Sequence, residues 1–133
     1  MADQRETDAA VARVALSYEA CLLAEAAAAA VPAAADELTA ARSVLEAINR
    51  YVAAVVALAR LRGDSWQQIA ASVGLPEESV RSVGSPDRDW WRTHLRQDPS
   101  EAAADLDDWV SRHVDGASDP TPVSKVLARR ATV

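Results

Sequence analysis

Between about Ala34 and Arg62 the chain carries its most regular apolar pattern, and this pattern predicts one long helix. Apolar residues recur there in alternating steps of three and four, as at the a and d positions of a coiled coil; they are Leu38, Ala41, Leu45, Ile48, Val52, Val55 and Ala59. A flanking line with a period of seven residues, Val44, Tyr51 and Leu58, makes the apolar face broader than a two-stranded seam needs. Such a helix is roughly 40 Å long, so we expect more than one neighbour to cover it.

The residues before this helix predict a second one, from Thr7 to about Val31. Residues 24–31 are nearly all alanine, which strongly favours a helix. Pro32 then marks a boundary, because proline in a helix interior costs about 3 kcal/mol. The apolar residues of this helix also follow a three-four spacing: Val11, Val14, Tyr18 and Cys21.

The two long helices are expected to form an antiparallel hairpin over residues 1–62. The broad apolar face suggests that the hairpin pairs with its twin as a dimeric four-helix bundle, so a second copy is one expected partner. The alternative is a monomer in which the hairpin folds back over the C-terminal helices. In the dimer, the interface is expected to contain Leu38, Leu45, Ile48, Val52 and Val55.

Residues 64–83 predict a helix-turn-helix. The apolar face of its first helix is formed at helical spacing by Trp66, Ile69, Ala70 and Val73. Two residue pairs can form a capping box at the start of this helix, Asp64 with Gln67 or Ser65 with Gln68.

The turn and the second helix of this motif have equally clear signals. Gly74 ends the first helix, because only glycine takes a left-handed conformation without steric cost. Pro76 suits the first turn of the next helix, since its φ is fixed and it has no N–H to leave unpaired. Val80 and Val83 lie three residues apart, so both can fold back onto the first helix.

The motif resembles a known family of DNA-binding modules. The residues that carry the resemblance are Trp66, Ile69, Ala70, Val73, Gly74, Leu75, Pro76, Glu77, Ser79, Val80, Arg81 and Ser82. In this spacing they resemble the promoter-reading helix-turn-helix of extracytoplasmic-function sigma factors, and they are similar to the DNA-binding domain of two-component response regulators. The resemblance covers residues 64–83 and implies double-stranded DNA as a partner. Two features depart from the family: residues 83–86 stop the second helix early, and no counterpart of the sigma core-binding domain is found before the motif.

Beyond the motif, two start signals predict two further helices. Ser85 and Asp98 each precede a proline, which gives an N-cap followed by a suitable first helical residue. The helices are expected over Pro86–Gln97 and Pro99–Val114, and the tail over Pro122–Arg130 forms one or two turns or is frayed. We therefore expect an all-α fold in three parts: a dimerising hairpin over 1–62, the helix-turn-helix with a C-terminal helical pair over 63–114, and a linker with a short helical or frayed tail over 115–133.

The charge balance limits how this chain can bind nucleic acid. The net charge is −6 and the predicted pI is about 4.8, which is the wrong sign for coating nucleic acid by charge alone. Basic charge is nevertheless concentrated around the motif, because residues 60–97 hold six arginines against five acidic residues. The segments on either side are acidic.

The second helix of the motif carries the candidate DNA contacts. Its DNA-facing positions are Glu77, Glu78, Ser79, Arg81 and Ser82, and Arg62 and Arg88 flank them as candidate phosphate ligands. Arginine can bond guanine or phosphate, serine a phosphate or a base, and glutamate the amino group of cytosine. The two carboxylates also oppose the phosphates. The alternative is a helix-turn-helix that serves only packing or protein docking.

The other reactive side chains have structural explanations. Cys21 lies on the apolar seam of the first helix, so we expect it to be buried and inert. His94 and His113 have no cysteine or acidic partner at ligand spacing, so no metal is expected. The tryptophans are expected in the core, and the acidic cluster on the solvated face of a helix comprises Asp105, Asp107 and Asp108.

These patterns favour a sequence-specific DNA-binding protein, a transcriptional regulator that reads the major groove with residues 76–83. The main alternative is a non-enzymatic adaptor whose acidic helices dock another protein, such as one of the transcription machinery; a purely structural bundle is a third. No Gly-rich phosphate loop, nucleophile with a base or carboxylate pair indicates an enzyme, and no cofactor is expected. The single cysteine, the polar N-terminus and the lack of a membrane-length apolar run suggest a cytoplasmic protein.

Overall fold

The computed structural model describes residues 2–33, 36–84 and 99–131. These residues form six helices and no strand, which confirms the expected all-α class. The helices are α1 (Ala2–Ala30), α2 (Glu37–Leu61), α3 (Trp66–Val73), α4 (Glu77–Gly84), α6 (Pro99–His113) and α7 (Ser124–Ala131). The helix expected over Pro86–Gln97, with Arg88, lies outside the described residues. None of the described helices is long and apolar enough to cross a lipid bilayer.

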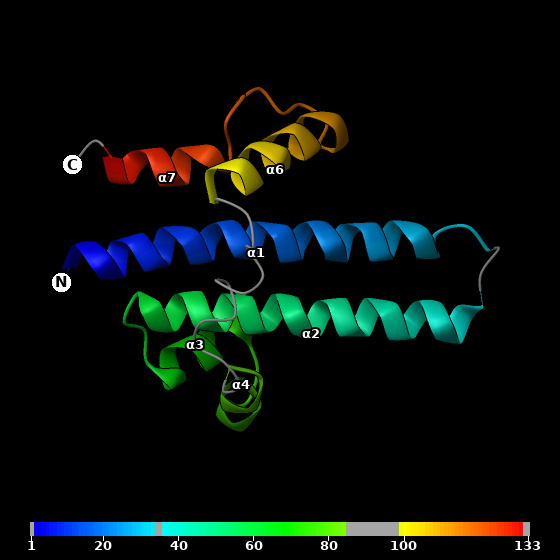
Figure 1. Cartoon of the computed structure of the whole chain (residues 1–133). Helices are drawn as coiled ribbons and strands as arrows, with labels where there is room; N and C mark the ends of the chain where they lie inside the picture. Colours follow the sequence, from blue (N-terminus) through cyan, green and yellow to red (C-terminus); the bar gives the residue numbers. More distant parts are fainter. Residues whose placement is uncertain (1, 34–35, 85–98, 132–133) are drawn as a thin grey trace.

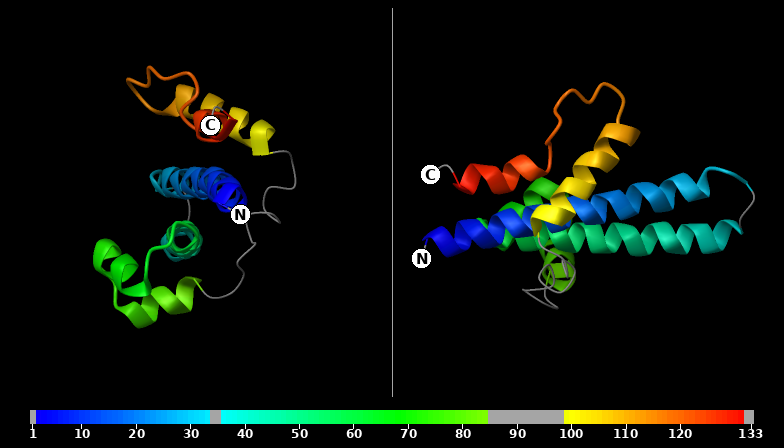
Figure 2. Two further views of the ribbon diagram at one scale, coloured as in Figure 1. Left: turned by 90° about the vertical axis from the view of Figure 1, so that its left-hand side faces the viewer. Right: turned by 45° about the horizontal axis from the view of Figure 1, so that its top comes forward.

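The helices are stacked in layers around a long antiparallel hairpin (Figures 1 and 2). Helices α1 and α2 run side by side and form the centre of the molecule. Helices α6 and α7 pack on α1, on the side away from α2, whereas α3 and α4 pack on α2 near its C-terminal end. The C-terminal helices therefore pack on the hairpin, and among the described residues they do not contact the helix-turn-helix with which the sequence grouped them.

The contact between α1 and α2 is made largely of small side chains. Ala12 and Ala15 of α1 meet Ala54 and Leu58 of α2 in one buried cluster. Alanine lets two helix backbones approach closely and loses no side-chain entropy on burial. Residues on this side of α2 again alternate in steps of four and three; we call them the alanine stripe, and they are Ala40, Val44, Ala47, Tyr51, Ala54, Leu58 and Leu61.

An ion pair between a buried carboxylate and a half-exposed arginine also joins the two long helices. The carboxylate of Glu19 on α1 is almost completely buried, at 1% exposure, and lies 3.5 Å from Nε of Arg50 on α2. A buried carboxylate is costly unless a positive group accompanies it, so this pair favours one register of the hairpin over its neighbours.

The opposite side of α1 holds the C-terminal helices. Val14 and Cys21 of α1 pack with Leu106 of α6 and with Val123, which precedes α7. Helix α1 is thus covered on two sides, which explains why apolar residues surround so much of it. The tail, expected as a short helix or a frayed end, is helix α7 and is docked on α1.

Candidate nucleic-acid interface

The helix-turn-helix begins with a complete capping box at Ser65. The Ser65 hydroxyl accepts a hydrogen bond from the Gln68 N–H (3.1 Å), and the Gln68 side chain accepts one from the Ser65 N–H (2.7 Å). Of the two pairs that the sequence offered, Ser65 with Gln68 is the one formed. Gly74 ends α3 with a φ of +81°, and its N–H donates to the Ala70 carbonyl at 2.9 Å.

A small apolar core fixes α3 and α4 on the C-terminal half of α2. Val56 of α2, Ile69 and Ala70 of α3 and Val80 of α4 are all buried in one cluster. Val80, the single fully buried residue of α4 among those described, anchors that helix from its inner side. The polar residues between the valines must therefore face outward, because one turn of helix separates the inner positions.

The outer side of α4 is exposed to solvent. Glu78, Ser79, Arg81 and Ser82 are exposed, and Glu77 is half-buried. No other described helix covers this side, since α4 contacts only α2 and α3. The expected DNA-facing positions thus lie together on a side of α4 that no other described helix covers.

Arg81 is held in place by two neighbours. Its Nε and Nη2 donate to Oε1 of Glu77 at 3.1 and 2.9 Å, and its guanidinium lies 5.3 Å from the centre of the Trp66 ring. Arg60 lies over the same ring at 4.6 Å and also donates to the Asp64 carbonyl. A guanidinium has five N–H donors, so Arg81 keeps three for a ligand after its bonds to Glu77.

The charge on the described motif is balanced. Residues 60–84 contain three arginines, Arg60, Arg62 and Arg81, and three carboxylates, Asp64, Glu77 and Glu78. Arg62 is exposed beside the C-terminal end of α2. The excess of positive charge expected for this region therefore depends on arginines between residues 85 and 98, outside the described ranges.

The residues expected in a dimer interface divide into two groups. Val52 packs against the core of the helix-turn-helix and Val55 against the α1–α2 core, so both are engaged within their own chain. Leu38, Leu45 and Ile48 are 81%, 60% and 37% exposed. Together with the exposed Ala41 they form an apolar line on the first half of α2, which we call the distal stripe.

The acidic cluster on α6 differs from the expected solvated face. Asp107 is buried, and its Oδ1 accepts hydrogen bonds from the N–H groups of Val123 (2.7 Å) and Ser124 (3.2 Å). Its Oδ2 accepts one from the Ser124 hydroxyl. Asp107 thus caps the N-terminus of α7 from another helix, while Asp108 remains exposed and pairs with Arg112 at 2.9 Å. No local pattern predicts this contact, because it joins residues 16 and 17 positions apart through a loop.

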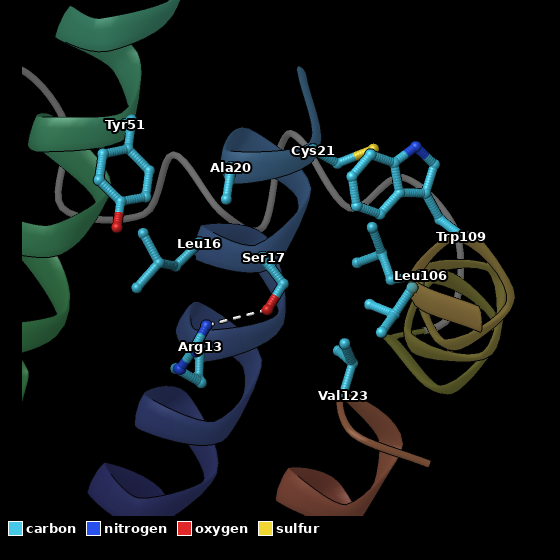
Figure 3. Close-up of a pocket in the computed structure, with 10 residues that line it drawn as sticks. Arg13, Leu16, Ser17, Ala20, Cys21, Tyr51, Leu106, Trp109 and Val123 are labelled. Atoms are coloured by element: carbon cyan, nitrogen blue, oxygen red, sulfur yellow. Dashed lines mark hydrogen bonds between the residues drawn. The ribbon is translucent and has the colours of Figure 1, made fainter. Parts of the chain in front are cut away.

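A cavity of about 200 Å³ lies between the hairpin and the C-terminal helices (Figure 3). Its walls are mainly apolar, with Leu16, Tyr51 and Trp109 among them. Two of its polar side chains have partners within the chain: Arg13 donates to the Ser17 hydroxyl at 2.9 Å, and the Cys21 thiol to Glu25 at 3.6 Å. The indole Nε1 of Trp109 is buried and has no hydrogen-bond partner among the described residues. Burial and the nearby Glu25 raise the pKa of Cys21 to about 11, which agrees with the expectation of an inert thiol.

His113 has a structural role on α6. Its ring stacks on that of Trp109 with 4.4 Å between centroids, and its Nδ1 lies 2.8 Å from the Trp109 carbonyl. Within residues 2–33, 36–84 and 99–131, no three histidine, cysteine or acidic side chains gather into a group suited to a metal ion. His94 lies outside these ranges. Comparisons of the chain with protein-family models, with curated proteins and with solved structures found no match, so its function must be inferred from the site itself.

Proposed function

We propose that the unit formed by the C-terminal half of α2 with α3 and α4 binds double-stranded DNA, and that the protein is a transcriptional regulator. The observation that carries this proposal is the outer side of α4, where Glu78, Ser79, Arg81 and Ser82 are exposed within the described part of the chain while Val80 anchors the helix. A helix presented in this way has the shape that enters a major groove. We also propose that the protein is located in the cytoplasm.

In the proposed complex the polar residues of α4 have separate roles. Arg81 reads guanine or bonds a phosphate with the donors that Glu77 leaves free, and its orientation is fixed before binding by Glu77 and Trp66. Ser79 and Ser82 contact phosphate or base edges, and Glu78 accepts from cytosine. Arg62 and Arg88 are the proposed phosphate contacts beside the groove.

The balanced charge of the motif sets the expected mode of binding. With three arginines matched by three carboxylates, the described surface attracts phosphate weakly. We therefore expect low non-specific affinity, so that specific sites are distinguished mainly by base contacts.

The test is selection of binding sites from random duplexes at several salt concentrations, followed by affinity measurements on the selected site. Arg81→Ala is expected to weaken specific binding by roughly 5- to 150-fold, the range for one lost bidentate base contact. Arg112→Ala is the matched control, because Arg112 is also an exposed arginine paired with a carboxylate four residues away. Equal affinity of the two variants, or no selected site at any salt concentration, would contradict the proposal.

A second function, docking of another protein, is favoured by a different observation. A groove of about 480 Å³ runs between α2 and α3, with Val55, Ala59, Ile69 and Val73 in its walls. Val73 and Leu75 beside the turn are about 40% exposed, although they are apolar. For an adaptor, Val73→Asp is expected to abolish binding of a transcription-machinery protein while leaving DNA affinity unchanged, which separates the two functions.

A further inference from the structure

Helix α2 carries one apolar line that is covered over only half of its length. Its second half, with Val52, Val56 and Ala59, is packed under α3 and α4. Its first half is the distal stripe, whose Leu38 and Leu45 are 81% and 60% exposed, and no described residue of another helix covers it. The a and d spacing runs unbroken from Leu38 to Val52, where the packing of α3 and α4 begins, so the exposed half has the pattern of a helix-packing surface.

We propose that the distal stripe is covered by the distal stripe of a second copy of this chain, with the two α2 helices antiparallel. A parallel pair would bring Val52 and Val56 of both copies together, and α3 and α4 already lie there. An antiparallel pair avoids this conflict, because each partner then extends away from the other's helix-turn-helix. A two-fold axis produces such a pair from identical surfaces.

The spacing of the distal stripe fits this antiparallel arrangement. With the two-fold axis beside residue 43, Leu38 lies opposite the partner's Ile48, and Ala41 lies opposite the partner's Leu45. Each pair of facing residues then joins an a position of one helix to a d position of the other. In the pairs nearest the axis, the small Ala41 faces the large Leu45. Every residue of the stripe has a counterpart.

The length of the free surface matches the length of the partner helix. In the same register, the partner's Glu37, the first residue of its α2, lies opposite Asn49. The partner helix therefore begins about one turn before Val52, where the packing of α3 and α4 on α2 begins. The partner's α2 and the chain's own helix-turn-helix would therefore cover consecutive parts of the apolar side of α2, without overlapping.

This arrangement also places the two helix-turn-helix units relative to each other. Val56, at the centre of the contact with α3 and α4, lies 13 residues from the axis at residue 43, so the two units are roughly 40 Å apart along α2. Successive half-sites on one face of B-DNA are about 34–36 Å apart. The further expectation that each unit reads one half-site rests on the proposed function, whereas the dimer does not.

Light scattering on purified protein without DNA tests the dimer alone. At concentrations up to roughly 1 mM, we expect the wild type to approach twice the 14.2 kDa of one chain. Leu45→Asp is expected to give one chain mass with an unchanged helical circular dichroism spectrum, because Leu45 is exposed within its own chain. Val114→Asp, which changes an exposed apolar residue outside the stripe, is the control and should still dimerise. A wild type that stays at one chain mass, or a Leu45→Asp variant that dimerises equally well, would overturn the proposal.

Disulfide cross-linking tests the direction of the pair, in a Cys21→Ala background. A mixture of Leu38→Cys and Ile48→Cys chains should form a cross-linked heterodimer on mild oxidation, because these positions face each other. Leu38→Cys alone should not, since the two copies of residue 38 are roughly 15 Å apart along the axis, beyond the reach of a disulfide. Efficient cross-linking of Leu38→Cys alone would show a parallel pair and overturn the antiparallel arrangement.

Discussion

Gly74 occupies the tightest point of the helix-turn-helix. Its φ of +81° lies in the left-handed region, and a Cβ built on it would meet no atom within 4 Å. The cost of a side chain at this position is therefore conformational and not steric. A non-glycine residue in this region is disfavoured by about 1–2 kcal/mol.

Gly74→Ala is expected to lower the free energy of unfolding by about 1–2 kcal/mol, measured by urea denaturation. Gly116→Ala is a matched control, because Gly116 has a φ of +77° and equally open surroundings in the loop after α6. Both variants should lose stability, but only Gly74→Ala should increase hydrogen exchange in α3 and α4. If Gly74→Ala has the same midpoint of urea denaturation as the wild type, this account of the turn is wrong.

The thiol of Cys21 predicts a dependence of stability on alkaline pH. Its pKa is raised from 9.0 to about 11 by burial and by Glu25, so the native chain keeps a proton that the unfolded chain releases. The stability associated with this proton is complete below pH 9 and is lost as the pH rises to about 11. The free energy of unfolding should therefore fall more steeply over this range for the wild type than for Cys21→Ala. Parallel curves for the two proteins would contradict the raised pKa.

Single residues differ in how well the sequence predicted them. A capping box at the start of α3, with Ser65 and Gln68 as one of two candidate pairs, and the turn at Gly74 were predicted, because each depends on neighbours within four residues. The roles of Asp107 and Glu19 were not, because each depends on a residue brought close by the fold. A carboxylate within an acidic run gives no local sign that it will cap a distant helix.

At the scale of elements, α7 depends on a cap that it does not itself contain. Asp107 accepts three hydrogen bonds at the start of this helix, and a carboxylate there also interacts favourably with the helix dipole. Asp107→Ala is expected to destabilise the docking of α7 by about 1–2 kcal/mol. Limited proteolysis should then cut the chain faster after residue 120.

Asp105→Ala is the control for this prediction, because Asp105 is exposed on the same helix. Its rate of cleavage should equal that of the wild type. If Asp107→Ala is cleaved no faster than the wild type, the apolar contacts of Val123 and Leu127 suffice to hold α7 in place.

Helix α2 shows why a correctly recognised apolar pattern does not reveal which helix packs against it. The three-four alternation of the large residues was clear in the sequence, but a second alternation, the alanine stripe, runs alongside it. The structure packs α1 on the alanine stripe, where small side chains let the helices approach closely, with Tyr51 and Leu58 filling the remaining space. Spacing identifies a packing surface, whereas side-chain volume and the rest of the chain decide what covers it.

At the scale of the whole molecule, two apolar clusters lie on opposite sides of the hairpin. One joins α2 with α3 and α4, and the other joins α1 with α6 and α7. Among the described residues the outer helices of the two clusters do not touch each other. Each cluster can therefore open without direct loss of contacts in the other.

Val80→Ala is expected to destabilise the helix-turn-helix by about 2 kcal/mol, because it removes two methyl groups from a fully buried site. Hydrogen exchange measured by mass spectrometry should rise in α3 and α4 and stay unchanged in α6 and α7. Leu106→Ala should give the opposite pattern. Equal increases in both clusters would show that the molecule opens as one cooperative unit.

The sequence predicted the helical class and most helix boundaries to within a few residues, because helical spacing, caps and prolines are local signals. It did not predict the order of the layers. Placing α6 and α7 on α1, away from the helix-turn-helix, depends on which of several apolar faces fit together. The exposed outer side of α4 and its proposed DNA contacts follow from local spacing, whereas the placement of Arg81 beside the Trp66 ring depends on the fold of the motif.

Because the proposed dimer interface lies on the same side of α2 as the contact with α3 and α4, detaching the helix-turn-helix is expected to change how copies of the chain associate. Release of α3 and α4 would uncover Val52, Val56 and Ala59 and extend the distal stripe to nearly the full length of the helix. Two such partly opened chains would then have room to join side by side in the same direction, which the closed form prevents. If the chain dimerises as proposed, folding of the helix-turn-helix would therefore prevent a competing, longer and parallel contact between two α2 helices.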